Sequence, residues 1–159
     1  MNIKSGGKYP SNALSNFAPH PFIIDGVGCN SMEGFLQSLK FKSVDMQEHV
    51  CTLVGRAAKK KGSKKNWKQS QILYWRGIEY KRDSDEYQEL LDKAYTSMYN
   101  DSNSFRKALE ATKDATLTHS IGKNKIKDTI LTTTEFCSRL TMLRDFGKII
   151  RKHEKKYKI

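Results

Sequence analysis

A carboxylate, an amide and an amine recur at helical spacing in the segment from Ser31 to Phe41. Glu33, Gln37 and Lys40 stand at i, i+4 and i+7, so a helix over this segment would place all three on one narrow stripe. Apolar residues border that stripe on both sides instead of lying opposite to it. An acid and a base held between apolar walls can form the floor of an active site.

A structural role accounts for the same residues. Asn30 is a suitable N-cap, and Glu33, three residues later, would then close a capping box. Lys40, near the end of the helix, would oppose the negative end of the helix dipole. The spacing alone leaves the catalytic and the structural interpretation open.

The composition favours one basic globular domain over residues 1–159. The chain is 37% hydrophobic and 10% aromatic, which is enough for one hydrophobic core. It has 29 Lys and Arg against 17 Asp and Glu, a net charge of +12. Such a charge attracts a polyanion, either nucleic acid or a phosphorylated small molecule. It also serves solubility, and composition does not separate these interpretations.

The use of cysteine and histidine argues against disulfides and metal sites. Cys29, Cys51 and Cys137 are odd in number and form no C-x-x-C pair, which predicts free thiols in a reducing, cytoplasmic compartment. The four histidines lack metal-ligand spacing, so neither a metal nor another cofactor is expected. The first ten residues are polar and no apolar run approaches membrane-spanning length, so we expect no secretion signal and no membrane partner.

The remaining patterns predict a mainly α fold with a small N-terminal β-hairpin. The hairpin is expected over residues 22–29, around Asp25-Gly26, a pair suited to a type I′ turn. Helices are expected from Asp45, which with Glu48 would form a capping box, to residue 57, and then over 84–98, over 102–109 and from Thr134 onward. The basic tail of about residues 147–159 either continues the last helix or frays.

Two further stretches carry side chains able to do chemistry. The run of lysines over residues 59–65 is predicted to be a mobile loop, because dense like charges repel and Gly62-Ser63 interrupts a helix. With Trp67 beside it, this run could hold phosphates and stack a base, although a solvated loop explains it equally. Residues 112–122 should be turn and extended chain.

Five separated motifs resemble the NADAR family of YbiA-like N-glycosidases. They are Leu14-Ser15-Asn16-Phe17 before Pro21-Phe22, Asp25-Gly26, Glu33-x-x-x-Gln37-x-x-Lys40-Phe41, Gly55-Arg56-x-Ala58-Lys59, and Thr112-x-Asp114-Ala115-x-Leu117. Their order and approximate spacing match from about residue 14 to residue 144. The resemblance implies a mostly helical YbiA-like domain that cleaves N-glycosidic bonds to ribose. The implied substrates are ADP-ribosyl-guanine, within DNA or RNA, and phosphorylated N-ribosyl intermediates of riboflavin synthesis.

The resemblance also implies roles for individual residues. Glu33 and Lys40 would be catalytic, with Lys40 as the candidate for attachment to the anomeric carbon of ribose and Lys59 as the second candidate. Asn16 and Phe17 would shape the pocket. The residues expected to bind substrate are Asn16, Phe17, Gln37, Arg56, Lys59, Trp67, Asp114 and His119.

One motif of the family is missing. Relatives carry Asp-x-x-Trp-Gly after the segment that ends at Leu117, whereas this chain has His119-Ser120-Ile121-Gly122-Lys123-Asn124. The acid of that motif is therefore absent or replaced. Asp114, His119 and Asp128 are the candidate replacements, and each is equally suited to a loop or capping role.

Hydrolysis of a ribosyl C–N bond is the chemistry that these residues favour. Its oxocarbenium-like transition state needs negative charge near the sugar and a proton for the leaving nitrogen. Glu33 can supply either, because the helix start favours its ionised form and burial its neutral form. A nucleophilic Lys40 must be partly deprotonated. The alternatives are a basic nucleic-acid-binding module, in which the lysine run and the tail hold the backbone, and an inactive relative that binds ADP-ribose.

Overall fold

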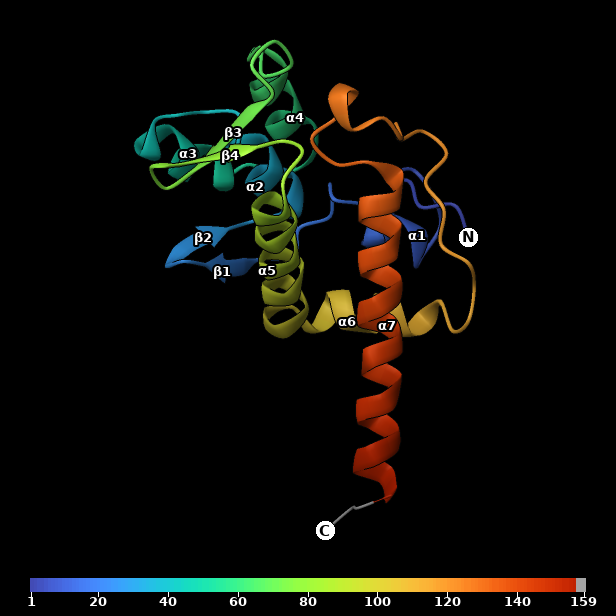
Figure 1. The fold of residues 1–159 in the computed structure, drawn as a ribbon. Helices are drawn as coiled ribbons and strands as arrows, with labels where there is room; N and C mark the ends of the chain where they lie inside the picture. The colour runs from blue at the N-terminus through green and yellow to red at the C-terminus, as the bar shows by residue number, and fades with distance from the viewer. Residues whose placement is uncertain (157–159) are drawn as a thin grey trace.

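The computed structural model describes residues 1–156, which form seven α-helices, a short 3-10 helix and two antiparallel hairpins. In chain order the elements are α1 (Ser11–Leu14), β1 (Phe22–Ile24), β2 (Val27–Cys29), α2 (Met32–Ser38), α3 (Val44–Cys51), α4 (Gly55–Ser63), β3 (Ile72–Trp75), β4 (Ile78–Lys81), α5 (Asp85–Asp101), α6 (Asn103–Ala111), η1 (Ile126–Asp128) and α7 (Thr133–Lys156). Figure 1 shows the two long helices α5 and α7 side by side, with α6 running from the lower end of α5 across the middle of α7. The predicted mainly α fold with an N-terminal hairpin is confirmed.

Helix α5 supplies the centre of the core. Its apolar face is buried as the helical spacing predicts, and it comprises Tyr87, Leu90, Leu91, Ala94, Tyr95 and Met98. Burying each large apolar side chain contributes about 1.5–3 kcal/mol, so this face is a main source of stability. The helix contacts α2, α6, α7 and both hairpins, and thereby fixes α2 relative to the C-terminal half.

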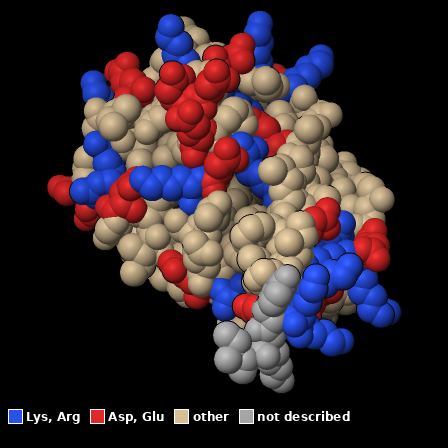
Figure 2. Space-filling view, turned by 60° about the horizontal axis from the view of Figure 1, so that its bottom comes forward, with Lys and Arg blue, Asp and Glu red and all other residues tan. Residues whose placement is uncertain are grey.

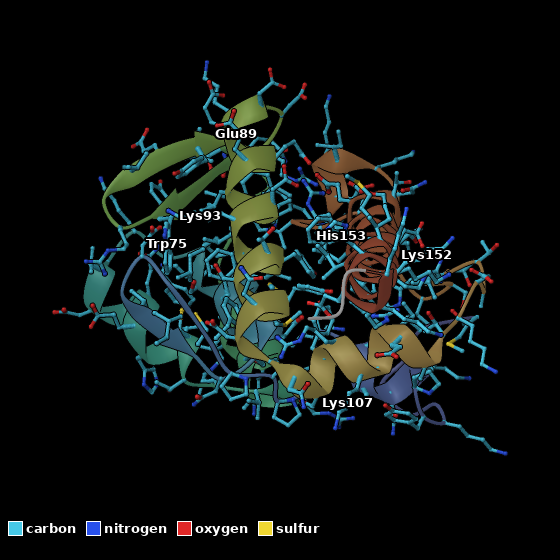
Figure 3. The ribbon with its side chains drawn as sticks, turned by 90° about the horizontal axis from the view of Figure 1, so that it is seen from below. Trp75, Glu89, Lys93, Lys107, Lys152 and His153 are labelled. Atoms are coloured by element: carbon cyan, nitrogen blue, oxygen red, sulfur yellow. The ribbon has the colours of Figure 1, made fainter. Side chains whose placement is uncertain are left out.

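The N-terminal hairpin turns at Asp25 and Gly26, whose φ angles of 49° and 78° fit the predicted type I′ turn. The carboxylate of Asp25 accepts a hydrogen bond from Trp75 Nε1 at 2.8 Å and forms an ion pair with Lys93. Trp75 and Lys93 lie next to each other at this point (Figure 3). The turn is therefore tied to β3 and α5, and β2 leads directly into α2.

The cap of α2 differs from the expected one. Ser31 is the N-cap, and its Oγ accepts a hydrogen bond from the backbone N–H of Gly34 at 3.0 Å. The Asn30 side chain instead donates to the carbonyl oxygen of Thr52. Glu33 thus lies one position too early to close a capping box, and this structural explanation of Glu33 is wrong.

The single helix predicted over residues 45–57 is two helices. Helix α3 starts after the N-cap Ser43, so the predicted capping box of Asp45 and Glu48 is wrong. Helix α3 ends at Cys51 and helix α4 begins at Gly55. The φ angle of Gly55 is +54°, a conformation that disfavours residues with a side chain.

The lysine run is helical up to Ser63 and is not the predicted mobile loop. Gly62 is buried inside α4, where a Cβ atom would lie 1.8 Å from Gln37 Oε1. This glycine therefore lets α4 pack closely against α2 and does not interrupt the helix. Packing against α2 offsets the repulsion among the lysines of α4, of which Lys59 and Lys60 are exposed and Lys61 is half-buried.

A second hairpin pairs β3 with β4, so that residues 72–75 run antiparallel to residues 78–81. Its turn at Arg76 and Gly77 again has two positive φ angles, 51° and 84°. The backbone N–H of Tyr74 donates to the carbonyl oxygen of Leu39 at 2.8 Å. The hairpin thus holds the C-terminal end of α2, next to Lys40.

The C-terminal part agrees with the expected elements. Residues 112–122 are irregular apart from one bridge between Asn2 and Thr118, and α7 starts at Thr133. The basic tail continues as helix to Lys156, and its last three residues lie outside the described ones. Within residues 1–156, no helix combines the length and the apolar character needed to cross a membrane.

Candidate functional site

A cavity of about 580 Å³ lies between α2, α4, the loop after α1 and the chain from residue 119 to residue 131. Most of the residues predicted to form a site line this one cavity: Asn16, Phe17, Glu33, Gln37, Lys40, Lys59, Trp67 and His119. These residues come from segments more than a hundred positions apart in the chain. The tertiary structure therefore brings together what the motifs only suggested.

Two predicted residues are not brought to the cavity. Arg56 is exposed on α4, one turn before Lys59. Asp114 is exposed and paired with Lys148, whose ammonium lowers the pKa of the Asp114 carboxyl. Of the three candidate replacements for the missing acid, only His119 and Asp128 line the cavity.

Hydrogen bonds fix both the backbone and the side chain of Glu33. Its backbone N–H donates to the carbonyl oxygen of Asn16 at 3.0 Å, and its Oε1 accepts a hydrogen bond from Gln37 Nε2 at 2.9 Å. The residue is 9% exposed. Burial raises the pKa of Glu33 more than the Gln37 hydrogen bond and the nearby cationic side chains lower it. The balance that the sequence left open is thus shifted toward the neutral acid.

Lys40 follows the last turn of α2 and is half-buried. Burial lowers the pKa of Lys40, the charge of Glu33 opposes this, and Lys68 and Lys59 reinforce it. Among the ion pairs of residues 1–156, none joins Lys40 to Glu33. The site therefore pushes both groups toward their uncharged forms, a proton donor beside an amine nucleophile.

Gln37 connects the two helices that form the cavity wall. Its amide nitrogen is used by Glu33, while its Oε1 is buried against Gly62 and has no hydrogen-bond partner within the described residues. Gln37 positions the Glu33 carboxyl.

The orientation of Asn16 is set by a residue that sequence reasoning assigned only to the core. The Tyr95 hydroxyl donates to Asn16 Oδ1 at 2.8 Å, and burial raises the pKa of Tyr95 well above its ordinary value, so it stays a donor. Because Oδ1 is occupied, Asn16 has its amide N–H groups left to offer to an acceptor in the cavity. No periodicity in the sequence could reveal this contact, since Asn16 and Tyr95 are 79 positions apart.

His119 also has a fixed orientation. Its Nδ1 lies 2.7 Å from the carbonyl oxygen of Ile3, which can only accept, so Nδ1 carries the proton and Nε2 is the free acceptor in the neutral ring. The ring packs edge-on against Phe136 with centroids 5.3 Å apart. His119 is thus a fixed part of the cavity wall.

Exposed cations are part of the cavity lining. They are Lys59, Lys68 and Lys123, and the exposed carboxylate of Asp128 lines the same cavity. Sequence reasoning missed Lys68 and Lys123, together with the apolar wall formed by Ile130, Leu131 and Phe136. The described residues contain no group of three or more side chains placed to hold a metal ion.

The fold and the site together place the protein in the class of YbiA-like folds. The NMR structure of the Escherichia coli protein YbiA is similar to it with a TM-score of 0.62 and 19% identity, covering 95% of this chain and 86% of that chain. The fold that the sequence resemblance implied is thereby confirmed.

Sequence comparison then gives the family itself. The model of the bacteriophage protein GP30.3 family matches residues 8–145, and the chain belongs to that family. It is 41% identical over 147 residues to an uncharacterized 17.1 kDa protein from the Gp30-rIII intergenic region of Enterobacteria phage T4. That similarity covers 91% of this chain and 97% of the phage T4 protein.

Proposed function

We propose that this protein is an N-glycosidase that hydrolyses the bond between the ribose of an ADP-ribosyl or ribose-phosphate group and a nitrogenous base. The observation that carries the proposal is the pair formed by buried Glu33 and half-buried Lys40, which line one cavity and are both shifted toward neutrality. The YbiA-like fold supports it, since the resemblance to the NADAR family implies the same reaction.

The charges around the cavity fit a phosphorylated substrate. The phosphate groups would lie near Lys59, Lys68 and Lys123, and the ribose would lie over α2. Asn16 would donate to an oxygen of the sugar, and Trp67, which is 6% exposed in the wall, would contact the base.

The reaction needs one acid, one nucleophile and one water molecule. The Lys40 amine bonds to the anomeric carbon as the C–N bond breaks, and Glu33 gives its proton to the leaving nitrogen. Water then attacks the same carbon, its proton passes to the Glu33 carboxylate, and Lys40 leaves as a neutral amine. Both side chains return to their starting protonation states.

The test is mass-spectrometric detection of released ADP-ribose or ribose 5-phosphate from a panel of substrates. The panel contains ADP-ribosyl-guanine DNA, ADP-ribosylated protein, phosphorylated N-ribosyl intermediates of riboflavin synthesis, and pyrimidine and pyridine nucleotides. We expect release from at least one of them. Tight binding of ADP-ribose or DNA without release from any member would instead support a non-catalytic binding module.

The substitution Glu33→Gln tests the residue that carries the proposal. Glutamine keeps the shape but has no proton to donate, so we expect turnover to fall by about 10²–10⁴-fold. The matched control is Glu89→Gln on the exposed side of α5, which should leave turnover unchanged. Turnover of Glu33→Gln close to that of the native protein would contradict the role of Glu33.

A further inference from the structure

The C-terminal half of α7 exposes a stripe of large apolar side chains. Met142 is 71% exposed, Phe146 54%, Ile149 66% and Ile150 40%. Figure 1 shows that α7 extends past α6, away from the rest of the domain. Single exposed apolar residues are ordinary, but four on one side of a helix indicate a surface that binds something.

The spacing of the stripe is that of a helix–helix seam. Met142, Phe146, Ile149 and His153 follow one another at intervals of four, three and four residues, which are the a and d positions of a heptad. His153 lies on the side of α7 nearer to α5, and Lys152 on the side away from it (Figure 3). Figure 2 shows Lys and Arg side chains gathered around the end of the chain.

Two opposite charges border this seam on the same side. In the heptad defined by the seam, Asp145 and Lys152 both occupy g positions, seven residues apart. Asp145 contacts Arg144 at 3.2 Å but its side chain stays 55% exposed, and Lys152 is exposed. On the other border, Leu143 and Ile150 occupy the e positions.

We propose that the stripe binds the same stripe of a second copy of this chain, with the two α7 helices antiparallel. In that arrangement Phe146 faces Ile149 of the second copy, and Met142 faces His153 of the second copy. Flanking g positions then meet each other, so Asp145 meets Lys152 of the second copy, and the two-fold axis repeats this pair. Leu143 and Ile150 meet on the opposite border, which extends the apolar contact.

The charges select this arrangement over a parallel one. Parallel helices pair g positions with e positions, which would set Asp145 against an isoleucine and leave both charges unpaired. The stripe is thus complementary to itself in one orientation.

The seam spans only about two heptads, so it would bury less area than a standard stable interface does. We therefore expect a weak dimer. The test is sedimentation velocity of the full chain over about a hundredfold range of concentration. The average mass should rise with concentration from the 18.3 kDa of the monomer toward twice that value. Phe146→Asp should keep the mass at that of the monomer throughout, with an unchanged far-UV circular dichroism spectrum because this side chain is exposed.

Control variants separate the seam from general effects. Ile149→Asp should behave as Phe146→Asp does, while Ile78→Asp, which changes an exposed isoleucine on β4, should associate like the native chain. Asp145→Lys alone and Lys152→Asp alone should each weaken association by about fivefold to tenfold, and the double variant should restore it.

Three outcomes would overturn the proposal. They are a native chain that stays monomeric at every concentration, a Phe146→Asp variant that associates as the native chain does, and charge reversals whose effects add instead of cancelling. A monomeric native chain that co-sediments with vesicles of anionic lipid, and loses this binding in Phe146→Asp, would assign the stripe to a membrane surface instead.

Discussion

Glu33 and Lys40 gain their chemistry from the loss of water. One helical stretch holds both residues, yet their environment depends on other segments. The carbonyl oxygen of Asn16 accepts a hydrogen bond from the backbone of Glu33, and the charges of Lys59 and Lys68 lower the pKa of Lys40. A solvated carboxyl and a solvated ammonium at the same spacing would both be charged at neutral pH. Burial, not spacing, is what makes this pair suitable for proton donation and nucleophilic attack.

The raised pKa of Glu33 predicts a particular pH dependence of stability. A carboxyl whose folded-state pKa exceeds its unfolded value stabilises the fold fully below the unfolded pKa and loses that contribution as pH rises through the folded pKa. Glu33→Gln carries no such charge, so the melting temperature of the native chain minus that of the variant should fall as pH rises from acid to neutral. Thermal melts of both proteins at several pH values measure this difference. A difference that rises over the same range would mean that the pKa of Glu33 is lowered by folding.

The covalent role proposed for Lys40 predicts a trapped intermediate. Ring opening of the sugar attached to Lys40 gives an imine, and borohydride added during turnover should reduce it to a stable amine. Peptide mass spectrometry should then find the sugar on Lys40. Lys42→Arg, a change at an exposed lysine two positions away, should still be labelled, and Lys40→Arg should not. Full turnover in Lys40→Arg would eliminate the covalent route.

At the scale of elements, the cavity depends on the close approach of α2 and α4. Gly62 lets the two helices meet over the Gln37 side chain, and Gln37 in turn holds the Glu33 carboxyl. The hairpin β3–β4 and the N-cap Ser31 fix the two ends of α2. A change in the packing of α4 should therefore affect Glu33 through Gln37, without direct contact with Glu33 or Lys40.

Gly62→Ala tests this coupling. Its Cβ would lie 1.8 Å from Gln37 Oε1, so α4 or Gln37 must shift, and we expect a loss of stability of about 1–3 kcal/mol from overpacking together with reduced turnover. Alanine inside an unobstructed helix would instead stabilise it, so the sign of the change is informative. Denaturant unfolding measures it. Gly6→Ala, where the added Cβ meets nothing within 4 Å, is the control and should change neither quantity.

At the scale of the whole molecule, lysines from distant parts of a basic chain line one cavity. They come from α4, from the loop after it and from the segment before η1. Their distance from one another in the sequence shows that this basic lining is a product of the fold. It links the composition of the chain to the polyanionic substrate proposed for it.

Salt should therefore weaken substrate binding more than it slows the reaction. Raising the ionic strength screens the exposed lysines of the cavity lining but has less effect on the buried Glu33, so we expect KM to rise while kcat changes little. Steady-state kinetics at several salt concentrations measure both constants. Lys59→Gln should reduce the salt dependence of KM, whereas Lys107→Gln on α6, an exposed lysine outside the cavity lining, should leave it as it is. A salt dependence carried mainly by kcat would contradict this picture.

The sequence by itself determined the features that depend on near neighbours in the chain. The buried face of α5 follows from the spacing of its apolar residues, the turn at Asp25-Gly26 from the preference of this pair for a type I′ turn, and the stripe of Glu33, Gln37 and Lys40 from one helical period. Most of the predicted residues that line the cavity lie in the motifs that resemble the NADAR family.

Only the tertiary structure decided the features that depend on distant segments. The lysine run is helical because Gly62 packs against Gln37, and Tyr95 orients Asn16 across 79 positions. Residues 121–131 close the cavity, and Asp114 is left outside it. The direction of the Glu33 pKa shift is decided in the same way, because the exclusion of water from a side chain depends on every segment packed around it.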